Sequence, residues 1–173
     1  MSRETRRLQV LLCLVLPVLA AAPAWAVLRR DDRPDADYRA LAQNPAFASV
    51  GLIQTSGLYQ DFSASGTLIA PSWVLTAAHV INDALGLTFE VGGESYLAAG
   101  YVVHPRWRGD VAQGFDLALV RLESPVAGVS PASRYRGRHE NGMRTVMVGF
   151  GRSGDGISGE VEDDLQKRAA DNV

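Results

Sequence analysis

The chain has 173 residues, of which 47% are hydrophobic and 21% are charged, and its formal net charge is −2. This balance is typical of one modest globular domain and excludes a disordered or fibrous chain. It also excludes the strongly basic face that proteins use to bind nucleic acid, so we expect no nucleic-acid partner.

The first 26 residues have the three parts of an export signal. A basic start, MSRETRR, is followed by an apolar stretch, LQVLLCLVLPVL, and by the small residues of AAAPAWA. The apolar stretch is shorter than the roughly 20 residues that a membrane-spanning helix needs. We therefore predict a signal peptide over residues 1–26 that is cut after Ala26, with an uncleaved anchor as the alternative.

Cleavage after Ala26 would leave 147 of the 173 residues. The net charge would change from −2 to −4, because the leader holds three arginines and one glutamate, and the only cysteine, Cys13, would be lost. No disulfide could then form, and the core would have to supply the stability. The signal and the disulfide-free chain favour a secreted or periplasmic protein of bacterial origin. We expect no membrane span after cleavage, and the sequence leaves the oligomeric state open.

The residue composition of the chain changes at Phe47. Residues 27–46 are charged, contain proline and show no clear period, which predicts an extended arm. Short runs rich in Val, Leu, Ile, Thr and aromatic residues follow, separated by Gly, Pro, Ser and Asp, and this spacing is typical of an all-β sandwich or barrel. A polar stretch over residues 128–144 looks like a connection between two units. Near the end, apolar residues four apart over residues 160–173 are compatible with a helix.

Two motifs carry the chemistry. SGTLIAPSWVLTAAHV, residues 65–80, resembles the stretch around the catalytic histidine of trypsin-like, chymotrypsin-fold serine proteases. GFDLALVRLESPV, residues 114–126, resembles the stretch around their catalytic aspartate, and YLAAGYVVHPRW and TVMVGFGRSGDG fall in the family's order. The resemblance implies an all-β, chymotrypsin-like double β-barrel, with a protease domain over residues 47–173.

The resemblance also implies roles for two residues. His79 would be the general base that takes the proton of a serine nucleophile, and Asp116 would be the acid that orients it. Many family members bridge two cysteines at positions that hold Ala64 and Val80 in this chain. Both ends of that bridge are therefore replaced by apolar residues.

These residue types also have other interpretations. His79 alone could be a packed core histidine, and Asp110 is a competing acid. His104 matches a common non-catalytic histidine of the family, and His139 lies in the polar connection, where we expect it to be solvated. No two of the three histidines have a ligand spacing typical of zinc sites, so neither a metal nor a cofactor is expected.

The nucleophilic serine of the family lies in a GDSGG stretch, which these 173 residues do not contain. The nearest match, GDGISG over residues 154–159, places Ser158 only 42 residues after Asp116. We therefore interpret Ser153 and Ser158 as loop serines. The resemblance implies that the first barrel is complete, that the second is only begun, and that the segment LQKRAADNV, residues 165–173, is a strand rather than a helix. An IVGG-like start, which family members use in activation, is also missing.

These observations favour a secreted serine-type endopeptidase that hydrolyses protein or peptide substrates. Because the serine-bearing part is absent from the sequence, we expect this fragment to be inactive. Two alternatives remain open: a catalytically dead secreted homologue that acts as a binding module, and a nonfunctional gene remnant.

Overall fold

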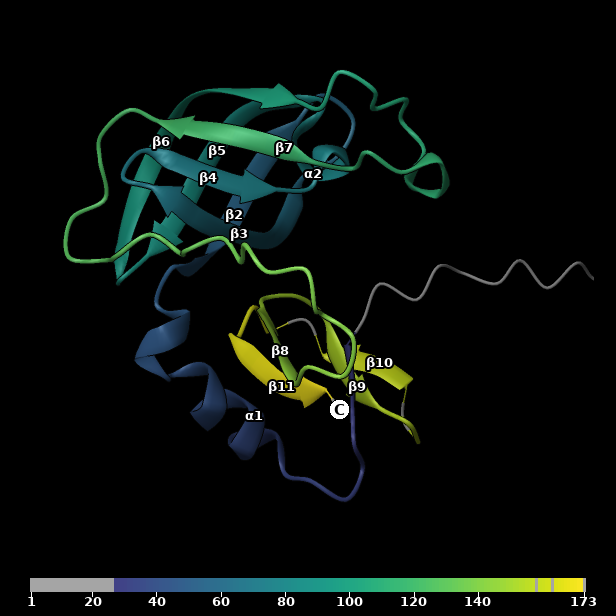
Figure 1. Cartoon of the computed structure of the whole chain (residues 1–173). Coiled ribbons are helices and arrows are strands. Elements are labelled where there is room, and N and C mark those ends of the chain that lie inside the picture. Colours follow the sequence, from purple (N-terminus) through teal and green to yellow (C-terminus); the bar gives the residue numbers. More distant parts are fainter. Residues whose placement is uncertain (1–26, 158, 163, 173) are drawn as a thin grey trace, which may run out of the picture.

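The structure is a computed structural model that describes residues 27–157, 159–162 and 164–172. Figure 1 shows a β-barrel above a smaller β-rich unit, and both the blue N-terminal arm and the long green stretch of residues 123–144 run between them. The predicted signal peptide, residues 1–26, lies outside the described residues. The prediction of an all-β fold with a complete first barrel is confirmed.

Six antiparallel strands close the first barrel, which therefore has no free edge. In the order of their pairing they are β2 (Val50–Gly57), β3 (Phe62–Ala70), β4 (Trp73–Thr76), β7 (Ala118–Leu122), β6 (Glu94–Val103) and β5 (Ala84–Val91).

Alternating side chains fill the barrel. On β7, Ala118, Val120 and Leu122 are buried while the residues between them are exposed, and β4 alternates in the same way. This period of two is what a strand with one face on the core produces. The largest fully buried side chains are Phe89, Ile53, Leu68, Ile81, Leu122, Val74 and Val120.

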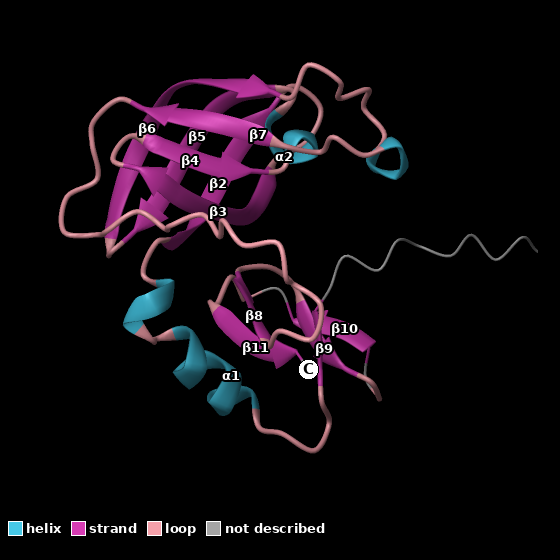
Figure 2. Cartoon of the chain, in the orientation of Figure 1, coloured by secondary structure: helices cyan, strands magenta, loops and turns pink. Residues whose placement is uncertain are grey.

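The second unit is built from short strands. Strand β8 (Thr145–Gly149) pairs antiparallel with β11 (Arg168–Asn172). Strand β9 (Ser153–Asp155) lies between β1 (Val27–Arg29), which runs parallel to it, and the antiparallel β10 (Gly159–Glu162). Figure 2 shows β9 and β10 beside each other below the barrel. The helical period of the last residues is therefore overridden by strand pairing, as the family resemblance implied.

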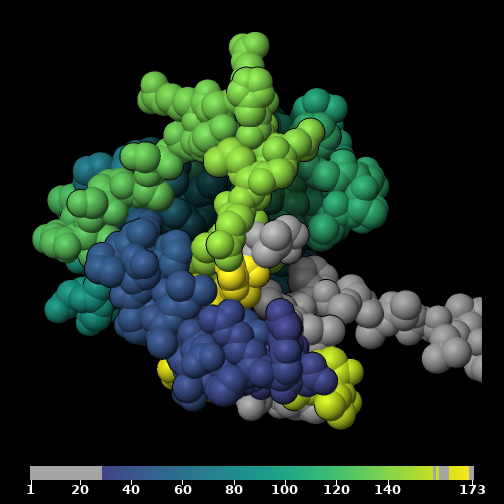
Figure 3. All heavy atoms as spheres, turned by 60° about the horizontal axis from the view of Figure 1, so that its bottom comes forward, coloured from purple at the N-terminus to yellow at the C-terminus, as the bar shows by residue number. Residues whose placement is uncertain are grey.

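The N-terminal arm differs from its expected extended form. It contains a helix, α1 (Asp35–Ala42), and a 3-10 turn, η1 (Pro45–Phe47). Tyr38 and Ala42, one turn apart, are buried, so the helix is stabilised by tertiary packing that a period search over a charged segment does not detect. In Figure 3 the blue arm lies across the front of the molecule, beside the yellow C-terminal residues. None of the helices in the described part of the chain combines the length and apolar character that a membrane crossing requires.

Candidate active site

His79 lies on α2 (Ala78–Ile81), a single helical turn shortly after β4. The other three residues of this turn, Ala78, Val80 and Ile81, are buried. The side chain of His79 is 24% exposed. The apolar run that precedes and surrounds the histidine therefore anchors the turn in the core and leaves the imidazole at the surface.

Asp116 lies just before β7 and contacts His79 twice. Its Oδ1 accepts a hydrogen bond from the backbone N–H of His79 at 2.9 Å, and its Oδ2 lies 2.7 Å from His79 Nδ1. An ionised carboxylate can only accept, so Nδ1 of the neutral ring is the donor and Nε2 is the basic nitrogen. The carboxylate thus fixes the backbone, the ring orientation and the tautomer together.

A shallow cavity of about 210 Å³ adjoins His79. The ring of Phe62 meets the imidazole edge-on, with centroids 6.1 Å apart and an interplanar angle of 78°. The cavity is lined by Tyr59, Gln60, Phe62, His79, Asn82, Asp83, Trp107 and Gly109. Neither serine nor cysteine occurs among these described lining residues, so the cavity places the base beside no serine or cysteine nucleophile.

The competing acid, Asp110, binds residues of the turn that follows it. Its Oδ1 accepts a hydrogen bond from Ala112 N at 2.9 Å, and its Oδ2 accepts one from Gln113 Nε2 at 3.1 Å. Asp110 therefore caps the short turn η2 (Val111–Gln113). Of the two acids considered from the sequence, Asp116 is the one that the structure brings to His79.

The remaining sequence candidates are dispersed. His104 stacks on Phe115, and His139 is exposed in the connection. Ser153 is buried within β9, so its interpretation as a loop serine was wrong, and Ser158 lies outside the described residues.

The two positions that correspond to bridged cysteines in many family members lie in the core region. Val80 belongs to the main hydrophobic cluster, and Ala64 packs against that cluster. Apolar packing at these two positions therefore replaces the disulfide that the family resemblance implies for other members.

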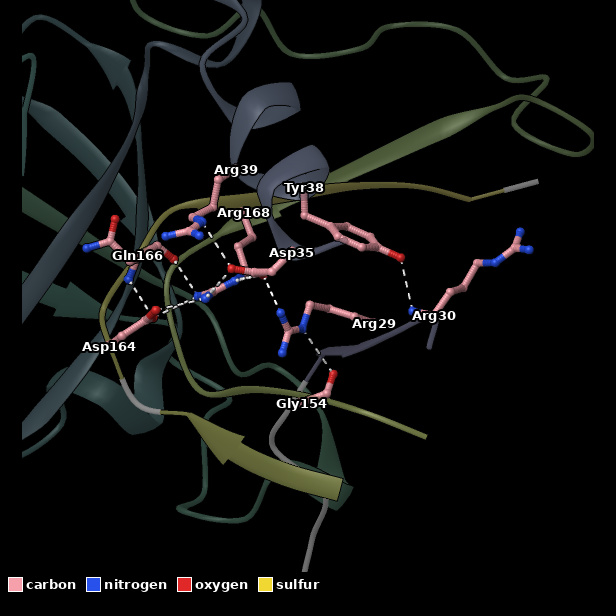
Figure 4. A network of polar contacts seen from close by, with 9 residues as sticks. All are labelled: Arg29, Arg30, Asp35, Tyr38, Arg39, Gly154, Asp164, Gln166 and Arg168. Atoms are coloured by element: carbon pink, nitrogen blue, oxygen red, sulfur yellow. Dashed lines mark hydrogen bonds and ion pairs between the residues drawn. The ribbon is translucent and has the colours of Figure 1, made fainter. Parts of the chain in front are cut away.

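Sequence reasoning missed a polar network that joins the arm to the second unit (Figure 4). Arg168 binds Asp35 at 2.7 and 3.1 Å and Asp164 at 2.7 and 2.8 Å, with both carboxylate oxygens used each time. Arg29 and Arg39 also pair with Asp35, at 2.6 and 3.0 Å. Asp35 and Arg168 are 133 residues apart, so no local pattern could reveal the contact.

The ion pairs of this network shift the pKa values of its charged side chains. Hydrogen bonds from Arg168 hold the pKa of the Asp35 carboxyl and that of the Asp164 carboxyl below their usual range. The same two carboxylates raise the pKa of Arg168. Burial lowers the pKa of Lys167, whose Nζ donates to the Phe47 carbonyl at 2.6 Å.

The trypsin family model matches residues 41–173. The chain belongs to the trypsin family. Curated relatives include human chymotrypsin-like elastase family member 1, which is 37% identical over 92 residues, or 46% of this chain and 35% of the relative. The Felis catus protein of the same name is 35% identical over 111 residues, or 53% of this chain and 41% of the relative.

Solved structures share the fold of this trypsin-family chain. HL collagenase has a TM-score of 0.62 at 18% identity over 73% of this chain and 57% of its own. The scabies mite inactivated protease paralogue S-I1 has a TM-score of 0.56 at 18% identity over 73% of this chain and 61% of its own. The predicted chymotrypsin-like architecture, with the first barrel complete and the second partial, is confirmed.

The match covers only part of each curated relative. The chain spans about a third to two-fifths of the length of these curated relatives. They are animal proteins, so they give no support to the bacterial origin expected from the sequence.

Proposed function

We propose that this chain carries the base and the orienting acid of a secreted serine endopeptidase, with His79 as the base and Asp116 as the acid. The observation that carries the proposal is the double contact of Asp116 with His79, at 2.9 Å to the backbone N–H and 2.7 Å to Nδ1. A carboxylate that only neutralised a surface histidine would not also need to bind its backbone.

The two residues would act together on a serine hydroxyl. Nε2 of His79 takes the proton of the hydroxyl as the oxygen attacks the peptide carbonyl, and later gives it to the leaving amine. Asp116 keeps the proton of the ring on Nδ1 and stabilises the imidazolium while it exists. The substrates would be proteins or peptides, bound beside the cavity that adjoins His79.

The nucleophile would come from sequence outside these 173 residues. GDSGG is absent from the sequence, and loss of the serine alone costs on the order of 10⁶ in kcat in a related mechanism. Loss of an oxyanion-hole donor costs a further factor of about 10²–10³. The 173-residue chain by itself is therefore inactive in this proposal.

Reading the gene beyond the codon for Val173 tests the proposal first. An open frame that runs into a GDSGG-containing segment supports it. The longest product should then react with a fluorophosphonate serine reagent, while the 173-residue chain should not. A stop codon directly after Val173, or a full product that neither reacts nor hydrolyses casein, would favour the binding-module or remnant alternatives.

A further inference from the structure

The residue before Asp116 has an unusual backbone. Phe115 has φ = 60°, in the left-handed region that bulky side chains avoid, and Leu165 is the only other non-glycine described residue with a positive φ. The carbonyl of Phe115 accepts a hydrogen bond from Leu117 N at 2.8 Å, so the chain turns tightly around Asp116. The conformation of Phe115 therefore sets the direction in which the Asp116 carboxylate leaves the backbone.

Two side chains hold the ring of Phe115. His104 stacks on it with centroids 5.1 Å apart and an interplanar angle of 17°, and Cζ of Arg106 lies 3.8 Å from the ring centroid. Parallel stacking and a guanidinium over the face of the ring are both favourable contacts. A strained backbone conformation persists only where surrounding contacts hold it in place, and these two contacts hold the Phe115 side chain.

The turn that carries these two side chains is itself fixed. The backbone N–H of His104 donates to the Leu117 carbonyl at 2.8 Å, and the His104 carbonyl accepts from Trp107 N at 2.9 Å. Nδ1 of His104 accepts from Arg106 N at 3.2 Å, which orients the ring, and Trp107 is buried in the core. The turn thus contacts the chain on both sides of Asp116, through the ring of Phe115 and the carbonyl of Leu117.

We propose that Phe115, whose ring is held by a clamp formed by His104 and Arg106, is a positioning residue that holds the Asp116 carboxylate against His79. The inference rests on the proposed pairing of His79 with Asp116 as base and acid. Phe115 is half-buried and is not part of the hydrophobic core cluster, so filling the core does not explain its conformation. Without the clamp the strained turn relaxes, and the carboxylate no longer stays within reach of Nδ1.

Proton NMR of the full chain tests this directly. A proton held between His79 Nδ1 and a carboxylate resonates at low field, outside the amide region, and disappears when it exchanges with water. We expect this resonance in the unmodified chain and its loss in Phe115→Ala. Phe115→Tyr keeps the ring and should keep the resonance. Val111→Ala, an exposed neighbour outside the clamp, is the matched control and should also keep it.

The outcomes separate the two proposals. If Phe115→Ala folds and retains the resonance unchanged, Phe115 does not position Asp116. If the unmodified chain lacks the resonance, the pairing itself fails, and the proposed function fails with it. If Phe115→Ala does not fold, Arg106→Gln decides: the exchange rate of the proton should rise by about two- to fivefold, the size of an exposed cation–π contact. An unchanged rate would overturn the inference.

Discussion

Ser65 and Phe150 exchange two hydrogen bonds between the first barrel and the second unit. Phe150 N donates to Ser65 Oγ at 2.8 Å, and Ser65 Oγ is within 3.2 Å of the Phe150 carbonyl, to which it donates. The carbonyl of Ser65 accepts from Thr76 Oγ1 at 3.0 Å, on the strand that leads to His79. Ser65 therefore links the second unit to the strand that positions the histidine.

The link between the two units predicts a double-mutant cycle. Ser65→Ala should cost about 1 kcal/mol per hydrogen bond lost. A Cβ added at Gly149 would lie 2.5 Å from Ser65 Oγ, so Gly149→Ala should cost about 1–3 kcal/mol. In the Ser65→Ala background that clash is gone, so Gly149→Ala should cost much less. Urea unfolding of the four proteins measures this, and strictly additive costs would show that the contact does not form.

The ion pairs of Asp35 predict a stability effect that its neighbour on the same helix lacks. Asp35→Asn removes the shared partner of three arginines, and we expect a loss of about 1–3 kcal/mol in the free energy of unfolding. Asp37 lies in the same first turn but is mostly exposed and pairs only with Arg33 at 3.6 Å among the pairs described. Asp37→Asn is therefore the control and should cost less than about 0.5 kcal/mol. Equal effects of the two variants in urea unfolding would contradict this account.

The lowered pKa values of Asp35 and Asp164 predict how stability depends on pH. A carboxyl whose pKa is lower in the folded state than in the unfolded state binds fewer protons when folded, so it stabilises the fold above its unfolded pKa, near 4. The free energy of unfolding should be nearly flat above about pH 5 with respect to these two groups and fall as the pH drops below 4. Asp35→Asn should reduce the acid slope. A slope that Asp35→Asn leaves unchanged would mean that the network is not formed in solution.

The proposed signal peptide predicts the N-terminus of the exported protein. Cleavage after Ala26 would leave Val27, the first residue of β1, next to β9 of the second unit. N-terminal sequencing of the exported protein should therefore begin at Val27. An exported product that retains residues 1–26 would instead support the uncleaved-anchor alternative.

The sequence predicted best those features that depend on a short stretch of neighbouring residues, such as a hydrophobic period or a single motif. The alternation of buried and exposed residues on β4 and β7 follows from the pleat of a strand, and the TAAH and FDLALV motifs predict His79 and Asp116 as site residues. The C-terminal residues show the opposite case, because a helical period there is overridden when β11 pairs with β8.

What the sequence could not reveal depends on partners far along the chain. The helix α1 is anchored by Arg168, and Ser153 is buried because β9 lies between β1 and β10. The left-handed conformation of Phe115 is likewise held by a turn about ten residues earlier, at His104 and Arg106. None of these contacts leaves a pattern within a short window of sequence.

Steady-state hydrolysis of casein by the longest product of this gene, with Asp116→Asn compared against Asp110→Asn, shows whether Asp116 orients a catalytic base. We expect Asp116→Asn to lower kcat by about 10⁴, because the ring of His79 loses its fixed tautomer. Asp110 only caps a surface turn, so Asp110→Asn should leave kcat nearly unchanged. Equal losses in the two variants, or an Asp116→Asn enzyme that remains fully active, would contradict the assignment of His79 and Asp116 as the base and its orienting acid.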